Sequence, residues 1–175
     1  KWNTLGVKNT IVINNPRTFE MSLPSTLKSK QALAIGRLDV EKGFDRLISL
    51  WSKIHILCPD WRLHIYGDGP LKGELQKMID ESNASGSIIL KGVATNIQSI
   101  IKDHSLLMMT SIYEGLPMVL LEAQACGLPI LSLDFPCGPK DVIENGVSGF
   151  VVSSSNTTEF VNRAVNLMSD WELRK

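Results

Sequence analysis

The chain has 175 residues, of which 43% are hydrophobic and 21% are charged, a composition typical of one globular domain with an ordinary core. Eighteen basic and eighteen acidic side chains give a formal net charge of zero, which argues against a nucleic-acid-binding protein and against a general attraction to acidic membranes. No stretch is apolar for long enough to span a bilayer, and three cysteines without metal-ligand spacing indicate reduced residues in a cytosolic protein.

The first thirty residues differ in pattern from the rest of the chain. Residues 8–16 contain a strand-like run that ends in an Asn-Pro turn signal, whereas residues 17–30 show little periodicity. We therefore expect residues 1–30 to form an interdomain linker and the start of a domain. Residues 31–175 are expected to form the domain proper, and the chain is expected to be a fragment of a longer protein.

From residue 31 onward, short apolar runs alternate with stretches of helical periodicity. The run at residues 32–35 lacks alternating polar residues, which is typical of a strand that is buried on both faces of a sheet. Repeated strand–helix units predict a Rossmann-like, three-layer α/β/α fold with a parallel sheet of about six strands. The expected strands lie at residues 32–35, 62–66, 87–90, 106–109, 130–133 and 149–152. The expected helices lie at residues 44–54, 71–79, 97–101, 117–126 and 156–168.

Right-handed crossover connections bring the loops that follow parallel strands to one edge of the sheet. That edge collects residues 36–43, 67–70 and 92–94, together with the loop that contains Glu114. Ligands in this architecture bind in the crevice that forms there. We therefore expect the functional site at the carboxyl ends of the strands.

The loop after the first strand carries two cations between Gly36 and Gly43. Arg37 offers a planar fork of donors and Lys42 a point charge, a combination suited to a diphosphate. Taken alone, however, the loop favours the simpler interpretation of two solvated surface cations. A diphosphate site therefore needs support from elsewhere in the chain.

The loop after the fourth strand leads into an apolar helix with two carboxylates near its start. We expect this helix to begin at Pro117, to be apolar on nearly every side and to lie sandwiched inside the layered fold. Glu114 lies just before the helix and Glu122 inside it, while the backbone N–H groups at the helix start form an anion site. The arrangement suits a nucleotide-sugar, which has a diphosphate between a sugar and a ribose. The alternative is that Glu114 precedes a surface helix and Glu122 pairs with a nearby lysine.

Two stretches resemble the principal motifs of one enzyme family. Residues 113–130, with Glu114 and Glu122 separated by seven residues, resemble the E-x7-E motif of retaining GT-B glycosyltransferases. The match is to glycosyltransferase family 4, also called glycosyl transferases group 1. Residues 36–43 resemble the G-R-L-x-x-x-K-G motif of the same family. Together the two motifs favour a donor site over isolated surface charges.

Two further segments resemble the same family, so that the resemblance covers most of residues 31–167. Residues 67–70 resemble the G-x-G-P turn, whose glycines most simply provide a tight strand-to-helix connection. Residues 135–146 resemble the G-G-P-x-E-I-I-x-x-G segment. Here Cys137 replaces the first glycine and Asp141 replaces the glutamate, departures that bear on which sugar is used rather than on the family.

The resemblance implies a role for the charged residues of the crevice. Arg37 and Lys42 would neutralise the diphosphate leaving group, and Gly36 of the same motif would belong to the donor-binding residues. Glu114 would contact the hydroxyl groups of the donor sugar. Glu122 would contact those of the ribose.

Backbone groups complete the implied site. Gly115 and Leu116 would contribute N–H groups to the phosphate or the sugar, where charge develops on cleavage. Val93, at the end of the third strand, is the candidate contact for the nucleobase. The resemblance requires neither a metal nor another cofactor, because the two cations take the place of a metal ion, and the sequence has no metal-ligand cluster.

The implied function is transfer of a hexose from a nucleotide-sugar donor, most simply a UDP-sugar, in the synthesis of a surface polysaccharide or glycoconjugate. An amino-terminal domain missing from this chain would bind the acceptor, a sugar or a lipid-linked glycan, and would supply a catalytic histidine. The isolated chain would therefore bind donor weakly and catalyse little. The expected location is cytoplasmic, with the full-length protein peripheral at the inner membrane face, and nucleic acid is not an expected partner.

Several alternatives stay open at this point. A GT-B-like sugar-nucleotide epimerase would carry further acid–base residues at the crevice, and a phosphorylase would carry a lysine for pyridoxal phosphate. A dinucleotide-binding Rossmann domain would have G-x-G-x-x-G directly after the first strand, where this chain has Gly36-Arg37-Leu38-Asp39. A non-catalytic nucleotide-sugar-binding module is a further possibility.

The three histidines are expected to be structural: His55, His64 and His104.

Overall fold

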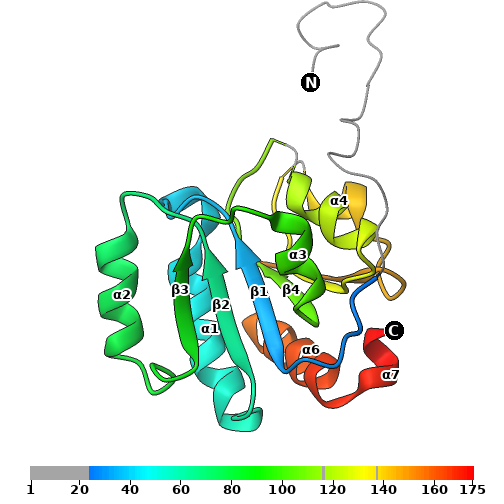
Figure 1. Ribbon diagram of the computed structural model, residues 1–175, viewed down its shortest axis with the longest axis horizontal. Helices are drawn as coiled ribbons and strands as arrows, with labels where there is room; N and C mark the ends of the chain where they lie inside the picture. Colours follow the sequence, from blue (N-terminus) through cyan, green and yellow to red (C-terminus); the bar gives the residue numbers. More distant parts are fainter. Residues whose placement is uncertain (1–23, 116, 137) are drawn as a thin grey trace, which may run out of the picture.

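Figure 1 shows the computed structural model of the chain, which describes residues 24–115, 117–136 and 138–175. The strand expected within residues 8–16 lies outside these ranges. So does the phosphate or sugar contact expected of Leu116.

Six parallel strands form one sheet in the order β3-β2-β1-β4-β5-β6, which confirms the predicted sheet. The order reverses between β1 and β4, where Ala32 lies opposite Leu106. Such a reversal is a topological switch point, and the loops that follow the two strands diverge to leave a crevice between them. The strands are β1 (Gln31–Ile35), β2 (Arg62–Tyr66), β3 (Ile88–Gly92), β4 (Leu106–Met109), β5 (Ile130–Leu133) and β6 (Gly149–Val152).

Helices cover both faces of the sheet (Figure 1). Successive residues of β1 point to opposite faces, so that Ala32 and Ala34 join the core on one side and Leu33 joins the core on the other. One core is covered by α1 (Phe44–Leu57), α2 (Lys72–Asp80) and α6 (Thr157–Ser169). The other is covered by α3 (Ile97–Lys102), α4 (Met118–Ala125) and α5 (Pro139–Val142). Two short helices complete the chain: η2 (Val40–Lys42), a 3-10 turn, and α7 (Trp171–Arg174).

The helix ends follow from local capping groups. Asn156 begins α6, since its Oδ1 accepts a hydrogen bond from the Glu159 backbone N–H at 3.1 Å and its Nδ2 donates to the Glu159 carboxylate at 3.0 Å. A glycine in the left-handed region, Gly127 at φ 62°, follows α4. The predicted boundaries of these helices are confirmed to within a few residues.

The prediction that the helix after Glu114 is buried on nearly every side is wrong. Within α4, Leu120 and Ala123 are buried, whereas the other side chains are partly exposed. The reason is that α4 packs on one side against α3, α5 and β5, while its outer surface has no second layer among the described residues. Glu122 therefore lies in a partly exposed position, not in an apolar interior.

Residues 24–30 pack against the domain at the amino ends of the strands. The Ser25 hydroxyl donates to the His104 carbonyl at 2.6 Å, and Leu27 is buried. The Leu27 carbonyl accepts hydrogen bonds from Arg174 Nη2 at 3.1 Å and Nε at 3.3 Å. Arg174 also donates to the carbonyls of Leu167 and Met168 near the end of α6, a favourable place for a cation.

Two of the three histidines form a buried pair. His64 Nδ1 lies 3.0 Å from His104 Nε2, and His104 Nδ1 lies 2.5 Å from the Ile100 carbonyl. Because a carbonyl can only accept, His104 Nδ1 carries a proton. Burial lowers the pKa of both histidines and so favours neutral rings, in which His104 Nε2 accepts from His64 Nδ1. Burial, assisted by the proximity of His104, lowers the pKa of His64 to about 4.

This pair predicts acid sensitivity of the fold. Between pH 6.5, the ordinary pKa of histidine, and about pH 4, the unfolded chain binds a proton at His64 that the folded chain excludes. The free energy of unfolding should therefore fall as the pH decreases through this window, by up to about 1.4 kcal/mol per pH unit from His64. Urea unfolding at pH 7, 6, 5 and 4 measures the slope. A His64→Asn variant should show a shallower slope, and an unchanged slope would contradict the assignment.

Candidate functional site

The loop after β1 folds back on itself and places Lys42 over the backbone. The Asp39 Oδ1 atom accepts a hydrogen bond from the Lys42 N–H at 3.3 Å, which starts η2, and Gly43 ends it at φ 60°. A Cβ added at Gly36 would lie 3.0–3.2 Å from three carbons of the Lys42 side chain. The glycine at position 36 therefore allows the stem of Lys42 to lie against the loop backbone.

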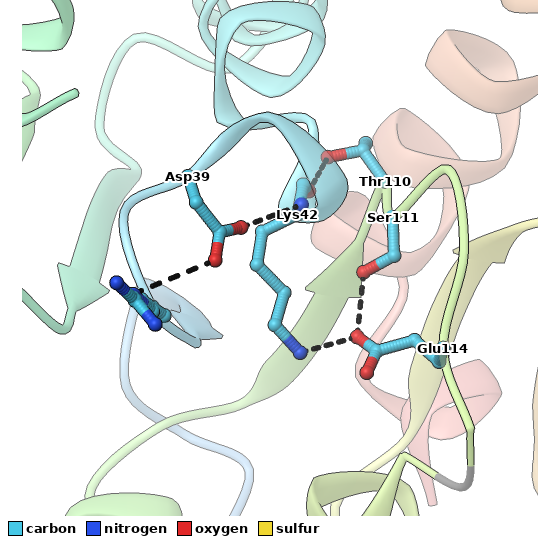
Figure 2. A network of polar contacts seen from close by, with 6 residues as sticks. Asp39, Lys42, Thr110, Ser111 and Glu114 are labelled. Atoms are coloured by element: carbon cyan, nitrogen blue, oxygen red, sulfur yellow. Dashed lines mark hydrogen bonds and ion pairs between the residues drawn. The ribbon is translucent and has the colours of Figure 1, made fainter. Parts of the chain in front are cut away.

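Lys42 and Glu114, which the sequence assigns to different parts of a donor, contact each other (Figure 2). The Lys42 Nζ atom lies 2.5 Å from Glu114 Oε1, and the two side chains are 23% and 10% exposed. The Ser111 hydroxyl donates to the same oxygen at 2.9 Å. The sequence analysis missed Ser111. The feature of the sequence that could have identified Ser111 is its position: a small polar residue two positions after a buried strand and three before Glu114.

The loops after β1 and β4 are also joined by hydrogen bonds to the backbone of the first loop. The Thr110 hydroxyl donates to the Gly43 carbonyl at 2.8 Å, and the Ile112 N–H donates to the Glu41 carbonyl at 2.8 Å. A Cβ added at Gly43 would lie 2.4 Å from the Thr110 carbonyl oxygen, so the close approach depends on glycine. The contact between Lys42 and Glu114 is thus built on a fixed loop-to-loop framework.

Arg37 belongs to a second part of the crevice. Its side chain is 72% exposed, with Nε 3.8 Å from Asp39 Oδ2. It lines a hollow of about 300 Å³ at the carboxyl ends of β1, β2 and β3. Val93, with 68% of its surface exposed, lies on the same hollow, as does Gly36. The full lining is Ile35, Gly36, Arg37, Tyr66, Gly67, Asp68, Val93 and Ala94.

The glycines after β2 shape this hollow through packing. A Cβ at Gly67 would lie 1.8 Å from the Gly36 carbonyl oxygen, and one at Gly69 would lie 2.5 Å from the Leu38 carbonyl oxygen. The Asp68 carboxylate accepts from the Gly69 N–H at 2.9 Å and lies 3.5 Å from the Lys72 ammonium. The structure is therefore consistent with the expected role of this segment as a tight turn.

The start of α4 faces the crevice with little cover. Among the described residues no side chain caps α4 at Pro117, and a Cβ added at Gly115 would meet no heavy atom within 4 Å. The space beside Gly115 is open to a ligand. Glu122 lies farther along α4, in a partly exposed position.

The segment after β5 is held by an ion pair at its own surface. Lys140 Nζ lies 2.6 Å from Asp134 Oδ2, and the Lys140 side chain is 69% exposed. A Cβ at Gly138 would lie 2.1 Å from the Phe135 ring. Lys140 is thus an exposed residue engaged with Asp134.

Within residues 24–115, 117–136 and 138–175, no group of three or more His, Cys, Asp or Glu side chains is placed to hold a metal ion. No helix of the described chain is both long and apolar enough to cross a membrane. Cys58 and Cys126 are buried free thiols, and burial raises the pKa of Cys58.

The family model described as "Glycosyl transferases group 1" matches residues 17–175. The amylovoran biosynthesis glycosyltransferase AmsD of Erwinia amylovora is 33% identical over 180 residues, an alignment that covers 99% of this chain and 50% of that protein. The lipopolysaccharide 1,6-galactosyltransferase of Salmonella typhimurium is 32% identical over 165 residues, covering 90% of this chain and 46% of that protein. The chain spans about half the length of these two relatives.

Solved structures show the same fold. A crystal structure of S. aureus TarM in a complex that includes UDP matches with a TM-score of 0.84 and 27% identity, covering 99% of this chain and 35% of that one. The pneumococcal O-GlcNAc transferase GtfA, in complex with UDP and GlcNAc, matches with a TM-score of 0.78 and 26% identity, covering 86% of this chain and 31% of that one.

Proposed function

The chain belongs to the glycosyl transferases group 1 family and has the fold of the carboxyl-terminal domain of a GT-B glycosyltransferase, and from this premise we propose that its crevice binds a nucleotide-sugar donor. The observation that carries the proposal is the contact between Lys42 and Glu114 at the switch point of the sheet, 2.5 Å apart and both largely buried. A cation and a carboxylate at this point match a ligand with a diphosphate beside a polyhydroxylated ring.

In this proposal the positive charges receive the leaving group. Lys42 has three N–H donors, one of which is directed at Glu114, and the others are available to the diphosphate. Arg37 is exposed beside the hollow and adds a planar fork of donors. In the transfer, the bond between the sugar C1 and the phosphate oxygen breaks, and the acceptor hydroxyl bonds to C1 through its oxygen and releases its proton. These two side chains stabilise the negative charge that develops on the diphosphate. They take the place of a divalent cation.

The remaining predicted residues surround the other parts of the donor. The Glu114 carboxylate accepts hydrogen bonds from the hydroxyl groups of the donor sugar. The Glu122 carboxylate accepts hydrogen bonds from the hydroxyl groups of the ribose. Gly115, beside which there is open space, and Leu116 offer backbone N–H groups to the phosphate or sugar. Val93 contacts the nucleobase across the hollow that it shares with Arg37.

We propose a UDP-sugar as the donor and a retaining, family 4 type of transfer. Support for UDP comes from the similarity to TarM and GtfA, whose structures contain UDP. Support for a hexosyl transfer in surface polysaccharide synthesis comes from the relatives named for amylovoran biosynthesis and for a lipopolysaccharide galactosyltransferase.

For the whole protein we propose a cytoplasmic enzyme, peripheral at the inner membrane face, whose acceptor is a sugar or a lipid-linked glycan. By the family resemblance, a separate amino-terminal domain binds that acceptor. Residues 1–30 are proposed to act as the connection to it, and residues 31–175 to form the donor-binding domain. Donor binding, without appreciable transfer, is therefore the activity that we propose for these 175 residues alone.

Calorimetric titration tests the proposal with UDP, UDP-glucose, UDP-N-acetylglucosamine, GDP-mannose and NAD. We expect uridine nucleotides to bind, and Arg37→Ala to weaken their binding about tenfold, the loss of one charge-assisted hydrogen bond. Arg62→Ala is the matched control, because Arg62 is an exposed arginine at the amino end of β2, on the opposite edge of the sheet. Binding of NAD alone, or equal weakening by both variants, would overturn the proposal.

A further inference from the structure

Ser111 is a buried hydroxyl at the centre of the crevice, and no motif of the sequence analysis accounts for it. It is 2% exposed and follows β4 by two residues. Its Oγ donates to Glu114 Oε1 at 2.9 Å (Figure 2). A buried hydroxyl needs a hydrogen-bond partner, and here the partner is a carboxylate, which makes the bond stronger than one between neutral groups.

The position of Ser111 is fixed from both sides. Its neighbour Thr110 is bonded through its hydroxyl to the Gly43 carbonyl, and its other neighbour, Ile112, through its N–H to the Glu41 carbonyl, both at 2.8 Å. The backbone at Ser111 is therefore clamped between two contacts to the η2 loop. A short side chain on a clamped backbone is a precise hydrogen-bond donor, because few torsions are left free.

The two donors that reach Glu114 select one of its oxygens. Lys42 Nζ and Ser111 Oγ both contact Oε1. A carboxylate oxygen can accept two hydrogen bonds, one along each lone-pair direction. The two contacts therefore fill both acceptor positions of Oε1, and neither of them involves Oε2. The carboxylate plane is thus set by two contacts at one atom.

We propose that Ser111 is a positioning residue for the donor sugar: it holds Glu114 by Oε1 so that Oε2 accepts hydrogen bonds from hydroxyl groups of that sugar. This inference rests on the proposed function. It adds that recognition of the sugar, as distinct from the nucleoside diphosphate, depends on a hydroxyl that touches neither. The hydrogen bond from the Lys42 backbone N–H to Asp39 does not involve Ser111.

The test compares the affinity for UDP with that for a UDP-sugar in each variant. UDP-glucose, UDP-galactose and UDP-N-acetylglucosamine are titrated by calorimetry, and the one that binds most tightly to the unmodified chain is used. Ser111→Ala should leave the dissociation constant of UDP nearly unchanged and weaken UDP-sugar binding roughly three- to tenfold, the effect of one lost hydrogen bond. Ser111→Thr, which keeps the hydroxyl, should retain the ratio of the two affinities.

Ser132→Ala is the matched control for loss of a buried hydroxyl. Ser132 is fully buried on β5, adjacent to Met109 of β4, and its Oγ donates to the Leu133 carbonyl at 2.8 Å. This variant should leave the ratio unchanged. If Ser111→Ala weakens the binding of UDP and of the UDP-sugar equally, or weakens neither, the inference is overturned and the proposed function stands. If no uridine nucleotide binds the unmodified chain, both are overturned.

Discussion

Replacing Lys42 with methionine is expected to weaken UDP binding about 10- to 150-fold. A hydrogen bond to a charged group contributes about 1.5–3 kcal/mol, and each 1.4 kcal/mol changes a dissociation constant about tenfold. Methionine keeps an unbranched stem that can lie over Gly36, where the lysine carbons now approach, so the change isolates the ammonium. Calorimetric titration of the variant and the unmodified chain with UDP measures the effect.

The same substitution should also lower stability, which provides an internal control. The Glu114 carboxylate is only 10% exposed, and the substitution removes one of its two hydrogen-bond donors, Lys42, while Ser111 remains. We expect a loss of about 1–3 kcal/mol in the free energy of unfolding. The double variant Lys42→Met with Glu114→Gln removes the uncompensated charge and should regain stability without regaining UDP affinity. A double variant that binds UDP as the unmodified chain does would show that Lys42 is not a phosphate ligand.

The largest effect on folding is expected from Gly67→Ala, which should lower the free energy of unfolding by about 3 kcal/mol or more. The added methyl group would lie 1.8 Å from the Gly36 carbonyl oxygen, and Gly67 has a φ of 149°, which side-chain-bearing residues rarely adopt. Gly36 follows β1 and Gly67 follows β2, and both strands lie in the interior of the sheet. Neither loop can therefore move without disturbing the pairing of its strand. Urea unfolding measures the loss.

Gly73→Ala is the control for this prediction. Gly73 lies on α2, where an added Cβ would meet no atom within 4 Å. Alanine there should stabilise the helix by about 0.5–1 kcal/mol. Equal stability of Gly67→Ala and the unmodified chain would mean that the loop after β1 yields easily, contrary to the close packing described above.

The strands of this fold could be predicted from the sequence because most of them are short apolar runs between turn residues. A run such as 106–109 is buried at every position, and its boundaries coincide with those of the pattern. The convergence of the loops on one edge followed from crossover handedness. By contrast, the burial of α4 was overestimated. Apolar composition does not indicate how many neighbours a helix has. In the part of the chain that the structure describes, α4 covers the sheet and nothing covers its outer surface.

The individual contacts of the site were beyond sequence reasoning. Arg37, Lys42 and Glu114 could be selected by their charge and motif context, yet the pairing of Lys42 with Glu114 depends on β1 lying beside β4. Their separation of 72 residues leaves no local trace. Ser111 was missed for a different reason. It is three residues from Glu114, and their contact depends on the loop turning Glu114 back toward β4.

Two buried polar features outside the site were also unforeseen. His64 lies on β2 and His104 lies between α3 and β4, 40 residues away, yet their rings are in contact. Arg174 satisfies carbonyls of α6 and of Leu27, 147 residues away. Each depends on tertiary packing that brings a polar group into a buried place together with its partner, which residue patterns along the chain do not encode.

The central claim is that the crevice between the β1 and β4 loops binds the nucleotide, and backbone amide chemical-shift mapping during titration with UDP tests it most directly. A second hollow, of about 270 Å³, lies at the opposite edge of the sheet and is partly lined by Gln124, Gly146, Ser148 and Phe150. We predict that the largest shift changes fall on Gly36, Lys42, Gly67, Val93 and Gly115. Changes concentrated on the residues of the second hollow, with the crevice amides unmoved, would contradict the account.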